Sequence, residues 1–276
     1  MLFRCHPRRL ALACFAVMPP SPTKSFNADR LPVRIFATLA DLATAAADDA
    51  AAVLIAAIAA RGRARAIIAT GNSQDQFLGQ LVQRGGIDWS KVELFHMDEY
   101  LGMPITHPAS FRRYLKQRVF DRVNPKAAHY LEGDALEPLK AMRDYAAALA
   151  AAPVDLCCLG IGENGHLAFN DPPVAEFADP EVIKLVKLDE KCRRQQVGEG
   201  HFPNLDAVPA YAITLTIPTL CRVGRMIAVV PEKRKAEAVK ASLEGPVATA
   251  CPGSFLRRQA HAVLYLDADS ASLLAR

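Results

Sequence analysis

The stretch Asp155-Leu-Cys-Cys-Leu-Gly-Ile-Gly-Glu-Asn-Gly-His-Leu-Ala-Phe-Asn-Asp-Pro-Pro173 carries an apolar segment directly into a glycine-rich turn with polar side chains. The segment from Val154 to Leu159 is nearly all apolar, which is typical of a parallel strand buried on both faces. The glycines that follow allow backbone conformations closed to other residues and a close approach to a ligand. Because ligands of open α/β sheets bind beyond the carboxyl ends of the strands, we expect the chemistry here.

The composition predicts one α/β domain that acts on a small molecule. The chain has 276 residues and a formal net charge of +4, with charges of both signs scattered along it. A basic block that would follow a nucleic-acid backbone is missing from this pattern, and no run approaches the ~18 to 20 uninterrupted apolar residues of a membrane span. We therefore expect neither a nucleic-acid nor a membrane partner.

The cysteines indicate a reducing compartment. There are seven, an odd number, without a Cys-x-x-Cys pair, and Cys157 and Cys158 are adjacent inside the apolar segment. This pattern argues against a disulfide framework and against a zinc site. We expect cytoplasmic localisation and no bound metal.

Residues 1–30 differ from the rest of the chain. Arg4, Arg8 and Arg9 precede a short apolar run, Leu10 to Met18, and then Pro-Pro-Ser-Pro. This order resembles a signal peptide, but the run is short and no small-x-small cleavage site follows it. We expect a disordered extension or a mistaken upstream start, with export as the alternative, and a domain spanning residues 31–276.

Apolar segments of strand length alternate with helical patterns from residue 33 onward. Expected strands cover residues 33–36, 66–69, 92–96, 128–131, 154–159, 211–216, 225–230 and 262–266. Expected helices cover residues 39–61, 74–83, 111–120, 137–151 and a segment ending at 243. Such alternation favours a Rossmann-like, open, mostly parallel sheet with helices on both faces.

Four polar clusters each follow a separate apolar strand. They are Thr70 to Ser73, Asp98 with Glu99, Asn164 to Asp171, and Lys233 to Lys235. Taken singly, each has an ordinary explanation, such as a helix cap, a structural glycine turn or solvent-facing lysines. Parallel strands would bring all four to one edge of the sheet, where they could perform proton transfers on a phosphorylated small molecule.

The two adjacent acids make a sharper prediction. An unpaired buried carboxylate costs several kcal/mol, so we expect Asp98 and Glu99 to avoid the core and one of them to act as a base. The polar segment 174–208 lacks clear periodicity, which is typical of a lid or binding loop.

These residues resemble the glucosamine-6-phosphate deaminase (isomerase) family, within the superfamily it shares with the 6-phosphogluconolactonases. The resemblance runs from about Val33 to Leu274 and is most specific in Met97-Asp-Glu-Tyr100 and in Gly160-x-Gly-x-Asn-Gly-His-x-Ala-Phe-Asn-x-Pro172. The lactonase branch is expected to carry Asp-Glu-Arg at the first motif and Ser-Leu-Phe-Pro in the second. Both motifs therefore favour the deaminase branch.

The resemblance implies roles for four catalytic residues. His166 would open the amino-sugar ring, oriented by Asp171 with Asn164 beside it, and Asp98 would be the base that moves a proton between C2 and C1. The implied reaction is aldose–ketose isomerisation and deamination of glucosamine 6-phosphate to fructose 6-phosphate and ammonia, a step of N-acetylglucosamine catabolism. It requires no cofactor, and many such enzymes are homo-oligomers, which we expect here too.

The resemblance also implies a phosphate site. The phosphate would lie on Thr70, Gly71, Asn72, Ser73 and Lys235. The arginine expected in the lid has no clear counterpart, and the candidates are Arg193, Arg194 and His201.

Two further departures leave alternatives open. Well-known deaminases carry an acid at the position of Asn164 and a glutamate at that of Asp171. The alternatives are a hydrolase of the 6-phosphogluconolactonase type, a deaminase of another amino-sugar phosphate, and a non-catalytic sugar-phosphate sensor.

Overall fold

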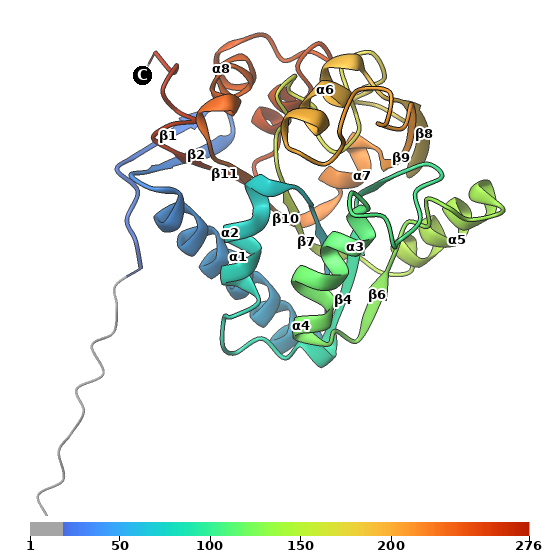
Figure 1. Cartoon of the computed structure of the whole chain (residues 1–276). Coiled ribbons are helices and arrows are strands. Elements are labelled where there is room, and N and C mark those ends of the chain that lie inside the picture. The colour runs from blue at the N-terminus through green and yellow to red at the C-terminus, as the bar shows by residue number, and fades with distance from the viewer. Residues whose placement is uncertain (1–18, 276) are drawn as a thin grey trace, which may run out of the picture.

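The computed structural model describes residues 19–275 and consists of one large sheet, one small sheet and the helices around them (Figure 1). The large sheet has the strand order β1-β2-β11-β10-β7-β3-β4-β6. Its strands are β1 (Lys24–Ala28), β2 (Leu31–Phe36), β3 (Ala64–Ile68), β4 (Val92–His96), β6 (Ala127–His129), β7 (Val154–Leu159), β10 (Val223–Val230) and β11 (Ala262–Asp267). Every pair except β1–β2 is parallel, which confirms the predicted mostly parallel sheet.

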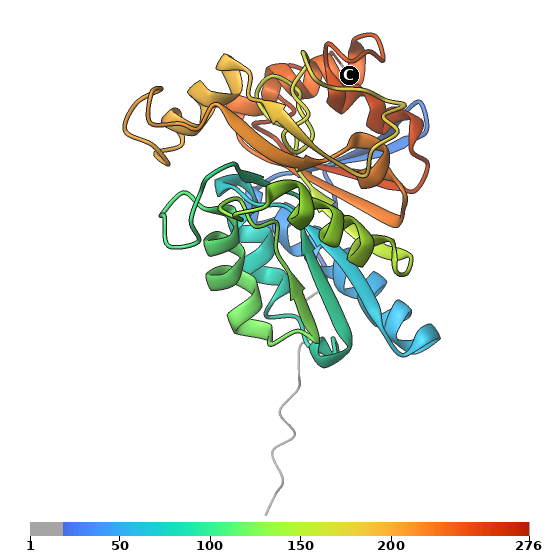
Figure 2. The same ribbon diagram turned by 90° about the vertical axis from the view of Figure 1, so that its right-hand side faces the viewer.

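Helices cover both faces of this sheet, as Figure 2 shows from the side. The α-helices of residues 19–275 are α1 (Leu39–Arg61), α2 (Asp75–Leu81), α3 (Phe111–Leu115), α4 (Asp121–Val123), α5 (Pro138–Ala150), α6 (Glu190–Gly198), α7 (Ile217–Cys221) and α8 (Ala236–Glu244). Side chains alternate between the two faces of β7: Leu156 and Cys158 pack in one cluster with α1 and α2, and Cys157 and Leu159 pack in another with α5 and α8. The buried strand therefore contributes to two cores, as its apolar sequence predicts.

Helix α1 begins and ends at the residues that its sequence predicts. The hydroxyl of Thr38 accepts a hydrogen bond from the Asp41 amide, and Gly62 ends the helix in the left-handed conformation, with φ 71°. Among residues 19–275, α1 alone is long and apolar enough to cross a membrane. It instead packs along the large sheet with Leu42 and Leu54 fully buried, as a core helix of the domain.

The N-terminal boundary lies earlier than expected. Of the segment 1–30, residues 1–18 fall outside the described part of the chain, and Lys24–Ala28 forms strand β1. Strand β1 pairs antiparallel with β2 across the short turn at Asp29. The edge of the sheet therefore begins within the segment that we expected to be an extension.

A second, antiparallel sheet is the main feature that the sequence analysis missed. Its strands, in the order β5-β9-β8, are β5 (Asp98–Tyr100), β9 (Tyr211–Leu215) and β8 (Ile183–Lys187). Strand β8 and helix α6 both lie in the segment 174–208, which we expected to be irregular. The small sheet and α6 share a third apolar cluster that includes Tyr100, Phe169 and Phe202.

Candidate active site

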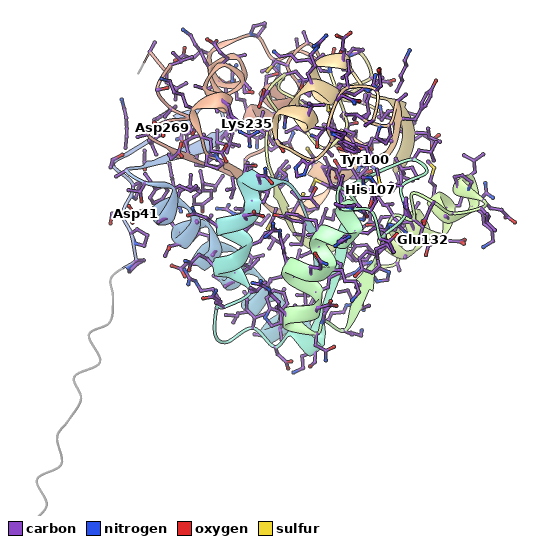
Figure 3. The ribbon with its side chains drawn as sticks, viewed as in Figure 1. Asp41, Tyr100, His107, Glu132, Lys235 and Asp269 are labelled. Atoms are coloured by element: carbon purple, nitrogen blue, oxygen red, sulfur yellow. The ribbon has the colours of Figure 1, made fainter. Side chains whose placement is uncertain are left out.

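The four polar clusters come together at the carboxyl ends of four neighbouring strands. Strands β10, β7, β3 and β4 are adjacent and parallel, so the segments that follow them lie at one edge of the large sheet. An open cavity lies there, and its lining includes Ser73, Asp98, His166 and Lys235. Figure 3 shows Lys235 and Tyr100, the neighbour of the two acids, in the same upper half of the molecule. The predicted convergence is therefore confirmed for one residue from each cluster.

The glycines of the turn after β7 make room for the histidine. A Cβ atom on Gly162 would lie 2.2 Å from the His166 ring, so any larger residue would displace the imidazole. Gly165 has a φ of 87°, and a Cβ there would lie 2.7 Å from the Cys251 sulfur. Both glycines are thus needed to hold the ring against the cavity.

A buried carboxylate lies behind the histidine. Nδ1 of His166 lies 3.0 Å from Oδ1 of Asp171, whose side chain is fully buried. Asp171 also accepts hydrogen bonds from Nδ2 of Asn164, at 2.9 Å, and from the backbone amide of Asp189, at 3.1 Å. Burial alone would raise the pKa of Asp171, but His166 and these donors outweigh it and hold the pKa below its ordinary value. The carboxylate stays ionised and can orient the imidazole, with Asn164 in the supporting position.

Cys192 completes the surroundings of Asp171. One ligand atom each from His166, Asp171 and Cys192 lies within 4.8 Å of the others, close enough to share a metal ion. Burial and the adjacent Asp171 charge raise the pKa of the Cys192 thiol.

Asp98 faces the cavity with no hydrogen bond to its carboxylate from any residue in the described range 19–275. Its side chain is nevertheless buried, with 6% of the residue exposed. Burial, followed by the charges of Glu99 and Asp171, raises the pKa of Asp98 well above its ordinary value of 3.8. A partly desolvated carboxylate without competing donors is a stronger base than one in water.

Glu99 corrects the prediction that both acids avoid the core. The residue is fully buried, and its oxygens accept hydrogen bonds from the Ser110 hydroxyl and from the amides of Tyr100, Phe111 and Arg112. The Arg112 guanidinium lies 3.5 Å away. Burial raises the pKa of Glu99 while these hydrogen bonds oppose the shift. The predicted penalty for a buried carboxylate is avoided because the start of α3 supplies the partners, and Arg112 is buried with them.

The turn after β3 forms the opposite end of the cavity. Gly71, with a φ of 106°, leads into the short helical turn Asn72–Gln74 and then α2, and Thr70, Gly71 and Ser73 line the cavity. The side chain of Asn72 instead donates to the backbone oxygen of Glu199, at 3.2 Å. Backbone amides at such a turn can receive an anion.

Lys235 reaches the same end from the segment after β10. Only 3% of the residue is exposed, and it lines the cavity. Burial lowers the pKa of Lys235, the Arg234 charge lowers it further, and Glu199 opposes both. Glu163 and Glu232 also favour its charged form, and an ammonium group that lines the cavity can bind a phosphate.

Comparison with known proteins agrees with this geometry. The sequence pattern of the glucosamine-6-phosphate isomerases/6-phosphogluconolactonases matches residues 37–265. The chain belongs to this family. A glucosamine-6-phosphate deaminase from Pseudarthrobacter chlorophenolicus is 36% identical over 212 residues, 75% of this chain and 80% of that protein. Another, from Exiguobacterium sibiricum, is 34% identical over 189 residues, 68% of this chain and 73% of that protein.

Solved structures of relatives share the fold. A monomeric glucosamine-6-phosphate deaminase superposes with a TM-score of 0.80 at 27% identity, covering 88% of this chain and 99% of the other. A 6-phosphogluconolactonase from Shewanella baltica superposes with a TM-score of 0.69 at 19% identity, covering 85% of this chain and 97% of the other. The second likeness concerns the fold alone.

The lid of this family member departs from the expected pattern. Arg193 donates to the backbone oxygens of Leu205 and Val208, and Arg194 pairs with Glu190 on an exposed face of α6. Neither arginine lines the cavity. The structure does not bring either candidate for the phosphate-binding arginine to the cavity, because both side chains make other contacts.

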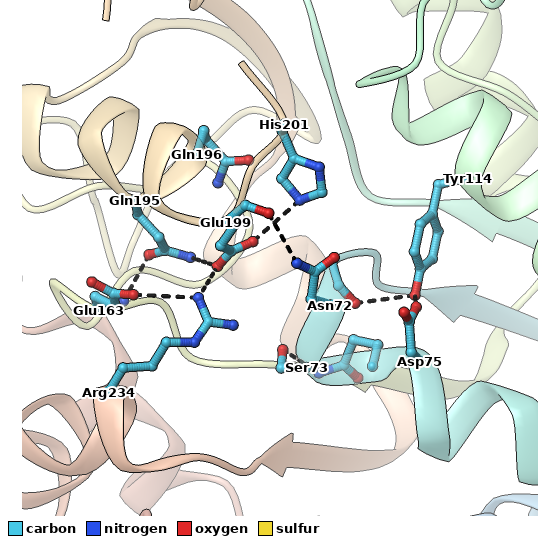
Figure 4. Close-up of polar contacts among 12 residues, drawn as sticks. Asn72, Ser73, Asp75, Tyr114, Glu163, Gln195, Gln196, Glu199, His201 and Arg234 are labelled. Carbon is cyan, nitrogen blue, oxygen red and sulfur yellow. Dashed lines mark hydrogen bonds and ion pairs between the residues drawn. The ribbon is translucent and has the colours of Figure 1, made fainter. Parts of the chain in front are cut away.

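The cavity face of α6 carries residues that the sequence analysis missed. They are Gln195, Gln196 and Glu199. Figure 4 shows Glu199 between His201 and Arg234, close to the turn that carries Asn72 and Ser73. Burial alone would raise the pKa of Glu199, but His201, Lys235, Arg234 and Gln195 together lower it to about 2.

His201, the third lid candidate, therefore acts through Glu199. Its Nε2 lies 3.3 Å from Oε2 of Glu199, and Arg234 pairs with the same carboxylate. The Arg234 contact joins the end of α6 to the segment after β10, and the hydrogen bond from Asn72 to the Glu199 backbone oxygen joins it to the segment after β3. A polar helix without an apolar stripe carried no periodic signal by which it could have been found.

Proposed function

We propose that this protein converts glucosamine 6-phosphate and water into fructose 6-phosphate and ammonia. The observation that carries the proposal is the position of the free Asp98 carboxylate, which shares one cavity with the His166–Asp171 pair and the Gly71–Ser73 turn. A base, a proton donor to the ring oxygen and an anion site are the groups that this reaction needs.

The reaction would follow from these positions. His166, oriented by Asp171, gives a proton to the ring oxygen and opens the sugar. Asp98 takes the proton from C2 and returns it at C1, while a proton from the amine passes to the C1 oxygen, which leaves an imine at C2 and a hydroxyl at C1. Water adds to the imine, ammonia leaves, and the ketone of fructose 6-phosphate remains. Thr70, Gly71, Ser73 and Lys235 would hold the phosphate, with Asn72 tying that turn to α6.

A direct assay separates this reaction from the lactonase chemistry of other family members. Purified protein is incubated with glucosamine 6-phosphate, with galactosamine 6-phosphate and with 6-phosphogluconolactone, and ammonia and acid release are measured. We expect ammonia from the first substrate at the highest kcat/KM. Lactone hydrolysis without ammonia would contradict the proposal, and tight sugar-phosphate binding without turnover would favour a sensor.

The cellular setting is part of the same proposal. The five cysteines within residues 19–275 are free thiols, which agrees with a cytoplasmic enzyme of amino-sugar and N-acetylglucosamine catabolism. The homo-oligomer expected from the resemblance stays a prediction, and light scattering on the purified protein tests it.

A further inference from the structure

One polar side chain of α6 faces the cavity without a role in the scheme above. Gln196 lines the cavity, and only 5% of the residue is exposed. Its Oε1 accepts a hydrogen bond of 2.8 Å from the hydroxyl of Tyr100. Its Nε2 makes no hydrogen bond with any residue of the described range 19–275. An amide that lines the cavity with two N–H donors free of protein partners is suited to a ligand hydroxyl, which can replace water at those donors.

Tyr100 fixes the orientation of this amide. The Tyr100 ring is fully buried among the rings of Phe111, Phe169 and Phe202, with centroids 5.1, 5.2 and 5.4 Å away. Burial raises the pKa of the Tyr100 hydroxyl well above its ordinary value, so it keeps its proton. The Gln196 oxygen is the acceptor for that proton, and reversing the amide would leave a buried hydroxyl without one. The Nε2 therefore points away from Tyr100, toward the cavity.

The position of Gln196 along the cavity follows from its neighbours. Tyr100 comes two residues after Asp98 on β5, at the catalytic end. Glu199 lies three residues after Gln196, just beyond the end of α6, and its backbone oxygen accepts a hydrogen bond from Asn72 at the phosphate end. Gln196 thus lies between the reacting carbons and the phosphate of a bound sugar.

We propose that Gln196 is a specificity-determining residue, whose Nε2 donates a hydrogen bond to the hydroxyl on C3 or C4 of the sugar phosphate. Tyr100 is the positioning residue that holds the amide in the donating orientation. The inference rests on the proposed function and adds to it the part of the substrate that distinguishes one amino-sugar phosphate from another. A neutral amide can donate a hydrogen bond to the hydroxyl on C3 or C4 without placing a charge beside Asp98.

Substitution by glutamate separates this role from a structural one. In Gln196→Glu the carboxylate still accepts from Tyr100, but the N–H donors are gone. Turnover is measured with glucosamine 6-phosphate and with its 3-deoxy and 4-deoxy analogues. We expect the wild type to lose about 10-fold in kcat/KM on one analogue, as the loss of one hydrogen bond to a buried donor predicts. For Gln196→Glu we expect kcat/KM on glucosamine 6-phosphate to fall about 10-fold. Its kcat/KM on that analogue should equal its value on glucosamine 6-phosphate, because the hydrogen bond is already lost.

The controls make the result decisive. Gln83→Glu adds the same charge at an exposed position and should keep wild-type values. Tyr100→Phe should weaken the discrimination between substrate and analogue, since the amide is then free to reverse. If Gln196→Glu keeps the wild-type ratio for both analogues, the proposal is wrong. Wild-type ammonia release reports the proposed function separately, and calorimetric binding of the same three sugar phosphates gives the same ratios without turnover.

Discussion

Asp98 and Glu99 are adjacent on one short strand, yet their surroundings are opposite. Glu99 accepts hydrogen bonds from the Ser110 hydroxyl and from three backbone amides, and Arg112 lies beside it. Asp98 faces the cavity, and no donor within residues 19–275 reaches its carboxylate. Because successive side chains of a strand point to opposite sides, one acid is directed to α3 and the other to the cavity.

The contrast shows how the fold separates a structural acid from a reactive one. Four donors use the hydrogen-bonding capacity of Glu99 and fix the loop that leads into α3. The same carboxylate charge contributes to the raised pKa of Asp98. Glu99 thus stabilises the fold and also strengthens its neighbour as a base. The predictions below test this division of roles.

The largest effect on stability is expected at Glu99. In Glu99→Gln the buried Arg112 loses a charge partner, and part of the hydrogen bonding at the start of α3 is lost. Removing one member of a buried pair costs about 3–5 kcal/mol, and Asp134, which also pairs with Arg112, places this case at the lower end. The urea midpoint should fall accordingly. An unchanged midpoint would show that Glu99 is dispensable for folding.

The next effect concerns the carboxylate behind the histidine. Asp171→Asn should lower kcat about 100-fold, because His166 would lose the charge that orients and stabilises its protonated ring. Asn164→Ala removes one of the donors to Asp171 and the acceptor of the His166 amide, but leaves the carboxylate in place, and should cost about 10-fold. Steady-state ammonia release measures both. If the two variants lost kcat equally, Asp171 would not contribute more than Asn164, which would contradict the assigned roles.

At the phosphate end the effect should fall on KM. Lys235→Met should raise KM for glucosamine 6-phosphate about 10-fold and leave kcat nearly unchanged, since a charge-assisted contact to the phosphate is lost. Lys233→Met, at an exposed position of the same segment, is the matched control and should behave as wild type. A tenfold fall in kcat for Lys235→Met would instead place this ammonium at the reacting carbons.

The smallest effect is a shift in the pH profile. Asp98 must be ionised to act as a base, and its raised pKa moves that ionisation upward from 3.8. We therefore expect kcat/KM to rise with pH along an acid limb well above pH 4. A profile that is flat down to pH 4 would contradict the raised pKa.

The same raised pKa has a consequence for stability. A carboxyl whose pKa is higher in the folded than in the unfolded state stabilises the fold at low pH. That contribution is lost as the pH rises through the folded-state value. Asp98→Asn should therefore unfold at a higher temperature than wild type at neutral pH, with a difference that shrinks toward pH 4.

The sequence could predict that the site residues converge at one edge of the sheet. It could not predict which residues of α6 line the cavity. Alternating strands and helices require parallel strands with a common carboxyl edge, which brings Asp98, His166 and Lys235 together whatever the loops do. Which side of α6 faces the cavity depends on how this polar helix packs. Its polar residues show no helical periodicity from which that side could be predicted. Gln196 and Glu199 were therefore missed, and the exposed Arg194 was proposed instead.

The burial of Glu99 shows a second limit. Its partners lie 11 to 13 residues later, at Ser110, Phe111 and Arg112. Ser110 caps α3, but whether the start of that helix reaches back to Glu99 depends on the path of the intervening loop. Pairwise contacts across a loop have no periodic signature in the sequence.

The account rests on Asp98 as the base, so the most direct test is the kcat of Asp98→Asn for ammonia release from glucosamine 6-phosphate, measured beside its melting temperature. The account predicts a loss of about 1000-fold or more in a protein at least as stable as wild type at neutral pH. A kcat within a few-fold of wild type would contradict it.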